Sequence, residues 1–364
     1  MKHSPSRLKF LLKPIGWFGS HRLTVRISYG AGIAAAALIC LSAVFIFNAD
    51  SIKLGHFSKN IDVPLPAQKY YSPLTGIEIS GPKNVNQAAT AIMIENSPSA
   101  RPQSGLKESG VVFEAIAEGG ITRFLVVYQH KKPELIGPVR SLRSYYVDWL
   151  APFNASVAHV GGSAAALREI RNGKYRDIDQ FFNSQAYWRA TDRYAPHNVY
   201  TNFDRLNTLN KAKGYTKSSV KGFARQDGEV AESPNAKNIN VNISNPTYNS
   251  SYTYASASNK YKRFQGGAPH NDREKGQISP SVVVVLKVNE TTVMEDGWRQ
   301  SIQTIGSGAA VIFQNGVAQE VTWNKSSRTS QIKFTDKKGE VVPFNRGQTW
   351  ITAVPNDSGS VTWN

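Results

Sequence analysis

Glu114, Glu118 and Arg123 are the first residues whose types and spacing could carry chemistry. They lie in residues 111–128, where two β-rich runs flank a Gly-Gly pair, a pattern typical of a tight hairpin. A two-residue turn would place Ile116 opposite Arg123, so that Glu118 and Arg123 are diagonal neighbours, with Glu114 on the same face. The arginine could position a carboxylate for acid–base work at a pocket edge. The alternative is a cross-strand ion pair, which contributes little if it is exposed.

Arg140 and Arg143 form a second candidate. Apolar residues at helical spacing follow a Gly-Pro pair, and they predict a helix over about residues 139–150. Both arginines would then occupy the first helical turn, where the dipole disfavours cations, so a negative group is expected nearby. That group is either an internal carboxylate, such as Asp148 or Glu118, or an anion bound by the arginines and free N–H groups.

Ser163 is a third candidate, in a Gly-Gly-Ser-Ala-Ala run between a predicted strand at 156–160 and a predicted helix at 164–171. This G-x-S-x-A form could place a nucleophile on a sharp elbow, followed in the chain by an aspartate and then by His197. Only 34 residues separate Ser163 from His197, which is short for that fold. An N-cap explains the serine equally well.

His159, His197 and His270 complete the candidates. The tetrapeptide Ala-Pro-His-Asn occurs twice, at 195–198 and at 268–271. A histidine in such a turn more often caps or packs than binds metal, and no HExxH or paired-cysteine spacing is present. P-loop and dinucleotide fingerprints are also absent, so the sequence predicts neither a metal site nor a cofactor. A metal site would require the histidines to converge with the hairpin carboxylates.

The elements that must position these residues form two predicted domains. Residues 71–220 alternate strands with helices, which predicts a mixed α/β domain. Residues 221–238 are polar and predict a linker. From 239 to 364 helical periodicity disappears, and short β-rich runs between tight turns predict a mostly β domain. We expect the two domains to be separate compact units.

The first 70 residues predict a membrane anchor. Residues 27–47 carry no charge over 21 residues, enough to cross a hydrocarbon core of about 30 Å as a helix. Six cations precede this span, so the positive-inside rule assigns residues 1–26 to a basic cytoplasmic tail. Residues 48–70 then form a stalk, and the bulk of the chain is extracytoplasmic. A cleaved signal peptide is the alternative, but the apolar run exceeds the usual length and no small-x-small site closes it.

Charge points to anionic partners. The chain has 43 basic and 26 acidic residues, and after the predicted tail 37 basic residues still face 26 acidic ones. Hydrophobic residues make up 40%, a composition that does not suggest disorder. The single cysteine, Cys40, lies in the apolar span, so the predicted outer part has no disulfide. Nucleic acid is a weaker candidate partner, because the lysines are dispersed.

Several short runs in both predicted domains match a known pattern. They are Ile94-Glu95-Asn96, Ala100-Arg101-Pro102-Gln103-Ser104-Gly105-Leu106, Glu118-Gly119-Gly120-Ile121-Thr122-Arg123, Gly137-Pro138-Val139-Arg140-Ser141, His159-Val160-Gly161-Gly162-Ser163, Ala195-Pro196-His197-Asn198, Tyr261-Lys262-Arg263, His270-Asn271-Asp272 and Gly347-Gln348-Thr349-Trp350. Together they resemble the YerB-like family of bacterial envelope-associated proteins, which are described as lipoproteins, from about Ser72 to the C-terminus. The resemblance implies an α/β domain followed by a β domain, and a family without a settled activity. Two departures stand out: an apolar span replaces the lipid-anchored cysteine, and Glu95 stands where an aspartate is expected.

Two function classes therefore stay open. In the first, the outer part binds an anionic envelope polymer, such as a phosphate-bearing glycan, through a pocket formed by Arg101, Glu114, Arg123, Arg140, Arg143 and His159. In the second, it is a hydrolase or transferase acting on such a polymer, with Glu118, Ser163 and His197 in acid–base or nucleophilic roles. Nucleic-acid binding at the cell surface is the third choice. Protein partners are not predicted.

Overall fold

The computed structural model describes residues 68–293 and 299–364. The predicted basic tail, the membrane helix and the stalk up to residue 67 lie outside the described residues. Within these two ranges, no helix has both the length and the apolar character needed to cross a membrane.

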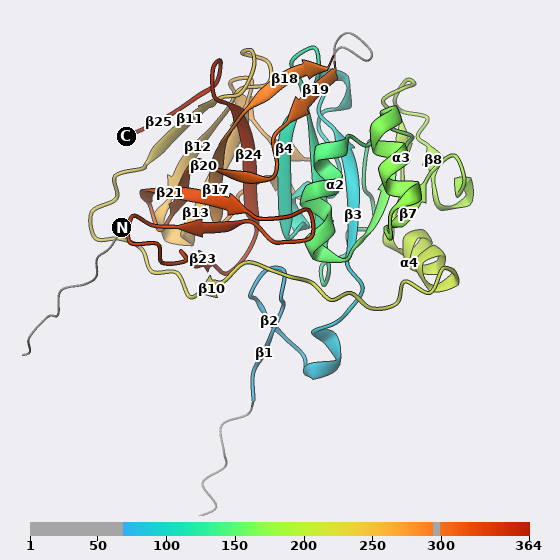
Figure 1. The fold of residues 1–364 in the computed structure, drawn as a ribbon, viewed down its shortest axis with the longest axis horizontal. Coiled ribbons are helices and arrows are strands. Elements are labelled where there is room, and N and C mark those ends of the chain that lie inside the picture. The colour runs from blue at the N-terminus through green and yellow to red at the C-terminus, as the bar shows by residue number, and fades with distance from the viewer. Residues whose placement is uncertain (1–67, 294–298) are drawn as a thin grey trace, which may run out of the picture. The chain divides into compact units, whose positions relative to one another are not determined.

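A mixed sheet of twelve strands runs through both predicted domains (Figure 1). The order along its main path is β22 (Lys333–Thr335), β21 (Val317–Lys325), β20 (Gly306–Gln314), β17 (Val282–Val288), β24 (Thr349–Pro355), β4 (Val111–Glu118), β5 (Ile121–Tyr128), β3 (Thr90–Glu95), β6 (Ser156–His159) and β7 (Arg176–Asp179). Off this path, β18 (Glu290–Val293) pairs with β19 (Arg299–Ile302), which also pairs with β4.

The two predicted domains meet inside this sheet, where β24 pairs in parallel with β4 from Thr349 opposite Val111 to Thr352 opposite Glu114. The described residues from 68 onward accordingly cluster as one compact unit. The two predicted domains thus share a sheet, a feature that sequence patterning did not predict, because pairing between strands far apart in the sequence leaves no local signal.

Smaller sheets complete the strand content. A five-stranded sheet has the order β14 (Ala268–Pro269), β13 (Lys260–Gln265), β12 (Ser250–Ala255), β11 (Asn238–Asn242) and β25 (Ser360–Trp363). The two-stranded pairs are β1 (Tyr70–Tyr71) with β2 (Glu78–Ile79), β8 (Trp188–Arg189) with β9 (Val199–Tyr200), β10 (Arg225–Gln226) with β23 (Phe344–Asn345), and β15 (Asn271–Asp272) with β16 (Gly276–Gln277).

Helices cover one half of the large sheet and the five-stranded sheet covers the other. The helices are α2 (Ser144–Leu150), α3 (Ala164–Asn172) and α4 (Phe203–Ala212). Aromatic residues of α2 and Ile170 of α3 pack on one face, together with Phe113 and Leu125. Leu206 of α4 and Tyr252 of the small sheet belong to the core on the opposite face. A mixed, sheet-rich fold is thus confirmed, and all three described α-helices precede residue 213.

The predicted hairpin is present, but its register contains a β-bulge. Glu118 pairs with Ile121 as predicted, whereas Arg123 lies opposite Ala115 rather than Ile116. The extra residue in β4 reverses the alternation of side chains between the two faces of the sheet. Glu114 and Glu118 therefore point to opposite faces, and the prediction that they share one is wrong.

The predicted helix starts later than expected. Helix α2 begins at Ser144, and Arg143 is its N-cap in an extended conformation. The preceding backbone is bonded to neighbouring segments instead: the N–H of Arg140 donates to the carbonyl of Met93 at 2.9 Å. Arg140 consequently lies outside the helix, and the prediction of two arginines in its first turn is wrong.

Candidate functional site

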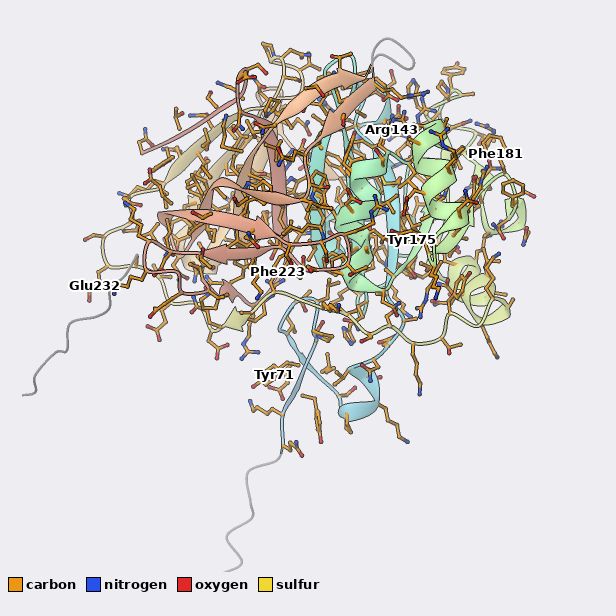
Figure 2. All side chains as sticks on the ribbon, viewed as in Figure 1. Tyr71, Arg143, Tyr175, Phe181, Phe223 and Glu232 are labelled. Atoms are coloured by element: carbon orange, nitrogen blue, oxygen red, sulfur yellow. The ribbon has the colours of Figure 1, made fainter. Side chains whose placement is uncertain are left out.

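Glu118, at the end of β4, lies at the centre of an arginine cluster. Its Oε2 is 3.2 Å from Nη2 of Arg123, and its Oε1 contacts Nη2 of Arg143 at the start of α2 (Figure 2). Nε of Arg299 lies 3.9 Å from Oε1. Arg123 also donates from Nη1 to the carbonyl of Ser141 at 2.9 Å, and burial lowers the pKa of its guanidinium. The negative group expected near Arg143 is thus an internal carboxylate, Glu118.

Arg140 has a different internal partner, Glu95 at the end of β3. Nε of Arg140 lies 3.1 Å from Oε1 of Glu95, whose side chain is only 5% exposed. The other oxygen, Oε2, lies 3.0 Å from Nδ1 of His197, and Oγ of Ser97 is 3.1 Å from that same nitrogen. Arg140 and His197 are therefore joined through a carboxylate that sequence reasoning did not assign to the site.

Glu114 is fully buried and connects the two halves of the unit. Its Oε1 and Oε2 lie 3.2 and 2.9 Å from Nη2 of Arg263, which is also fully buried. Nε1 of Trp350 donates to Oε2 at 2.9 Å, and the hydroxyl of Thr122 donates to Oε1 at 3.2 Å. A buried ion pair is tolerated when further hydrogen bonds satisfy its remaining atoms, as they do here.

Hydrogen bonds continue from Arg263 into the second Ala-Pro-His-Asn copy. Nε of Arg263 donates to Nδ1 of His270 at 2.9 Å, so Nε2 of His270 carries the proton that it donates to Oε1 of Gln103 at 3.0 Å. Burial, with the charges of Arg263 and Arg101, lowers the pKa of His270 well below its usual value. This histidine is therefore neutral at physiological pH.

The chain of bonds then closes on itself. Gln103 donates to Oδ1 of Asn96 at 2.9 Å, Asn96 donates to Oγ1 of Thr122 at 2.6 Å, and Thr122 donates to Glu114. We call these six residues the buried ring: Glu114, Arg263, His270, Gln103, Asn96 and Thr122.

Ser163 and His159 have local partners. Oγ of Ser163 accepts the backbone N–H three residues on at 3.3 Å, so it is the N-cap of α3. His159 is buried, with Nδ1 2.8 Å from the carbonyl of Gly161 and Nε2 2.9 Å from Oδ1 of Asp177. Among the contacts of the described residues, none joins Ser163 to His197.

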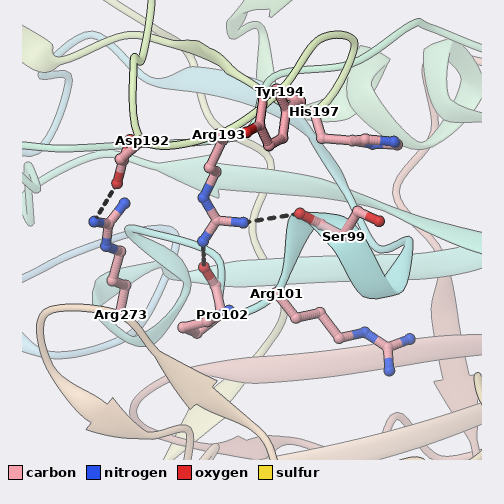
Figure 3. Close-up of a pocket in the computed structure, with 8 residues that line it drawn as sticks. All are labelled: Ser99, Arg101, Pro102, Asp192, Arg193, Tyr194, His197 and Arg273. Atoms are coloured by element: carbon pink, nitrogen blue, oxygen red, sulfur yellow. Dashed lines mark hydrogen bonds and ion pairs between the residues drawn. The ribbon is translucent and has the colours of Figure 1, made fainter.

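A cleft of about 510 Å³ lies beside the buried ring, where the loops after β3 and β8 meet the turn between β15 and β16 (Figure 3). We call it the arginine cleft. Its lining residues are Ser99, Arg101, Pro102, Asp192, Arg193, Tyr194, His197 and Arg273. Of the predicted site residues, the cleft includes Arg101 and His197.

Sequence reasoning missed Arg193 and Arg273. One signal could have found them: an Asp-Arg pair accompanies each Ala-Pro-His-Asn copy, at 192–193 and at 272–273. In the structure the two pairs meet, because Nη2 of Arg273 lies 2.5 Å from Oδ2 of Asp192 (Figure 3).

Arg193 and Arg101 are held by neutral groups. Arg193 donates to the carbonyls of Ser99 at 3.1 Å and Pro102 at 2.6 Å. Arg101 donates to the carbonyl of Asn96 at 3.0 Å and, from the same Nη2, to that of Thr247 at 3.1 Å. Within residues 68–293 and 299–364, neither arginine has a carboxylate partner at ion-pair distance.

Burial also lowers the pKa of Arg101, since its positive charge is partly desolvated without an adjacent counter-charge. The cleft therefore presents two uncompensated guanidinium groups, together with Arg273 and its partner Asp192. Such groups favour an anionic ligand with several oxygens.

A larger groove of about 870 Å³ lies elsewhere on the unit, but its chemistry is less specific. Lysines and glutamates both line it, including Lys107, Lys131, Glu78 and Glu108, and none of the predicted site residues does. Across the described ranges, no group of three or more His, Cys, Asp or Glu side chains could hold a metal ion.

Comparisons with known proteins agree on one group of relatives. A family model described as "Protein of unknown function (DUF3048) N-terminal domain" matches residues 74–216, and the corresponding C-terminal domain model matches residues 239–351. The chain is 32% identical over 307 residues to "Putative lipoprotein YerB" of Bacillus subtilis (strain 168), covering 82% of this chain and 91% of that protein. The crystal structure of Bacillus subtilis YerB superimposes with a TM-score of 0.73 at 31% identity, covering 81% of this chain and all of the other.

Proposed function

The chain belongs to the DUF3048, or YerB-like, family, and we propose that it is a membrane-anchored, extracytoplasmic envelope protein that binds a phosphate-bearing anionic polymer in the arginine cleft. The family resemblance predicted from the sequence motifs is confirmed. Two observations support the proposed location. The name of the Bacillus subtilis relative describes a lipoprotein, and in this chain six cations precede the uncharged span at residues 27–47.

The observation that carries the binding proposal is the pairing pattern of the arginines. Arg123, Arg140 and Arg143 each have an internal carboxylate partner, Glu118 or Glu95, so a ligand there would compete with an existing ion pair. In contrast, Arg101 and Arg193 are held by carbonyl and amide oxygens, and both line the arginine cleft, where their guanidinium groups point in different directions (Figure 3). The phosphate groups of a polymer could accept hydrogen bonds from each guanidinium group and neutralise its charge.

The binding test uses the full chain in mild detergent and measures its affinity by titration calorimetry. The probes are inorganic phosphate and a teichoic-acid-type polymer, meaning a glycan or polyol chain linked by phosphate. Arg193→Gln removes a charge-assisted hydrogen bond worth about 1.5–3 kcal/mol, so affinity for both probes should fall about ten- to hundredfold. Affinity should also fall as salt rises.

The matched control is Lys337→Gln, which removes one positive charge from a side chain that is 87% exposed. It should leave affinity unchanged. Equal effects of the two substitutions would mean that only overall charge attracts the polymer, and the cleft would be rejected as the site. Arg140→Gln tests the sequence prediction that Arg140 belongs to the binding site. A large loss of affinity in this variant would move the site to the ion pair between Arg140 and Glu95.

The proposed membrane topology has a separate test. Protease added to intact or wall-stripped cells should digest the chain after about residue 50, because the positive-inside rule assigns the basic tail to the cytoplasm. Protection of the C-terminus would contradict the proposed topology.

A further inference from the structure

His197 lines the arginine cleft and uses one ring nitrogen internally. Nδ1 lies 3.0 Å from Oε2 of Glu95 and 3.1 Å from Oγ of Ser97. A carboxylate only accepts hydrogen bonds, so Nδ1 carries a hydrogen, and in the neutral ring Nε2 carries the lone pair. Among the described residues Nε2 has no hydrogen-bond partner, and His197 lines the cleft (Figure 3).

Further contacts hold this orientation. Glu95 is almost fully buried, and Nε of Arg140 lies 3.1 Å from its second oxygen. Its backbone carbonyl accepts a hydrogen bond from Gln103 of the buried ring at 3.0 Å. The N–H of His197 donates to the carbonyl of Tyr194 at 2.9 Å, which fixes the turn that bears the ring. A carboxylate that fixes the tautomer of a histidine is the arrangement that general bases use.

We propose that the arginine cleft is catalytic, and that His197 acts there as general base in the hydrolysis of a phosphodiester bound by Arg101 and Arg193. The inference rests on the proposed function, because the substrate is the phosphate-bearing ligand of that same cleft. Glu95 is a positioning residue, since it acts through His197.

The step balances with water as the only co-reactant. Nε2 of His197 accepts a proton from a water molecule as the water oxygen forms a bond to phosphorus. The bond from phosphorus to the leaving oxygen breaks, and that oxygen keeps the electron pair and takes a proton from solvent at the cleft mouth. His197 then releases its proton to solvent, and the products are an alcohol and a phosphomonoester. Arg101 and Arg193 stabilise the charge that develops on the phosphoryl oxygens.

The serines fit this reaction less well as nucleophiles. Oγ of Ser97 contacts Nδ1 of His197, the nitrogen whose hydrogen faces Glu95, so that nitrogen cannot take the serine proton. Ser163 caps α3 and has no contact with His197 among the described residues. Water is therefore the nucleophile that the geometry favours.

The test measures hydrolysis of bis(4-nitrophenyl) phosphate by the full chain in detergent, together with phosphate affinity by calorimetry. The leaving group of this diester needs no acid, so the assay isolates the role of the base. His197→Gln should lower turnover by about 10²–10⁴-fold and leave phosphate affinity nearly unchanged, because the arginines remain. Glu95→Gln should also lower turnover, and Glu95→Asp, which keeps the carboxylate, should retain more activity than Glu95→Gln.

His130→Gln is the matched control, because His130 lies in the separate larger groove. It should leave turnover unchanged. Phosphate binding without turnover above the buffer rate would overturn this inference while leaving the proposed function standing, as would equal turnover of wild type and His197→Gln. Absence of phosphate binding would overturn both.

A second measurement does not depend on the choice of substrate. Nitrogen-15 shifts of the His197 ring report which nitrogen carries the hydrogen. Wild type should show the hydrogen on Nδ1, and Glu95→Gln should change that distribution. A neutral ring with its hydrogen on Nε2 would overturn the assignment of His197 as base.

Discussion

The two copies of Ala-Pro-His-Asn end in different surroundings. His270 is 4% exposed and bonded at both ring nitrogens, to Arg263 and Gln103. The His197 side chain is 25% exposed, lines the arginine cleft and is bonded at one ring nitrogen, while the other has no hydrogen-bond partner among the described residues. The same four residues therefore give a neutral link in a buried ring and a partly exposed histidine in the cleft beside it.

The difference lies in the surroundings rather than in the turns. Around His270 burial makes a protonated ring unfavourable, and the Arg263 guanidinium adds to this effect, since both would be buried cations. Around His197 the nearest charged group is the Glu95 carboxylate, which accepts a hydrogen bond from the ring. His270 thus has both ring nitrogens bonded inside the buried ring, whereas our proposal assigns ligand binding to the arginine cleft beside it.

The largest expected effect comes from breaking the buried ion pair. Arg263→Met leaves the carboxylate of Glu114 buried without its cation, and the free energy of unfolding should fall by about 3–5 kcal/mol. Urea denaturation measures this loss. The double variant Arg263→Met/Glu114→Gln should cost less than the sum of the single changes, because it leaves no unpaired charge.

The matched control is Glu320→Gln, which breaks an exposed pair with Lys337 and should change stability by less than about 0.5 kcal/mol. If Arg263→Met lowered stability as little as this control, the buried ring would not maintain the fold. The comparison between the buried ring and the arginine cleft would then fail.

The next effect concerns pH. The pKa of His270 is lowered in the folded protein, whereas in the unfolded chain it is near the usual value of about 6.5. Below that pH the unfolded state binds a proton at His270 that the folded state does not bind. The contribution of the neutral histidine to the free energy of unfolding is therefore complete above pH 6.5 and is lost as the pH falls below it. The slope is about 1.4 kcal/mol per pH unit.

His270→Gln should reduce that slope. Glutamine keeps an acceptor for Arg263 and a donor for Gln103 but does not titrate. Unfolding curves at several pH values between 5 and 7 give the slope for both proteins, which differ in this one ionisable group. Identical slopes would contradict the neutral assignment of His270.

Local sequence patterns predicted many strands and helices correctly. They failed where contacts between segments distant in the sequence determine the local structure. The strands at Val111–Glu118 and Ile121–Tyr128 have the predicted bounds, because the Gly-Gly turn and the β-rich runs are local signals. The bulge in β4 has no such signal, and it separated Glu114 from Glu118. Similarly, α2 starts late because Met93 and other distant residues take up the backbone hydrogen bonds before it.

The candidate site was only partly predictable for the same reason. Sequence reasoning named Arg101 and His197, which line the cleft, and Arg123, Arg140 and Arg143, which pair with internal carboxylates. Whether an arginine meets a carboxylate or a carbonyl depends on segments that are close only in the fold. The repeated Asp-Arg pair was visible in the sequence, but its meaning depended on β15 and the loop after β8 meeting in space.

The smallest predicted effect tests whether charge in the arginine cleft can be tuned without cost to the fold. Asp192 is the one carboxylate among the described lining residues, and its pairing with Arg273, chiefly through a hydrogen bond, lowers its pKa. Asp192→Asn frees that arginine for the ligand, so phosphate affinity should rise about two- to fivefold, the range expected for an exposed ion pair. The melting temperature should not change. Asp227→Asn is the matched control, because Asp227 is 86% exposed and pairs with Arg346 at the same 2.5 Å distance, away from the cleft. A lower affinity in Asp192→Asn would mean that the Asp192–Arg273 pair organises the cleft, so that ligand binding and local structure would be coupled there as they are in the buried ring.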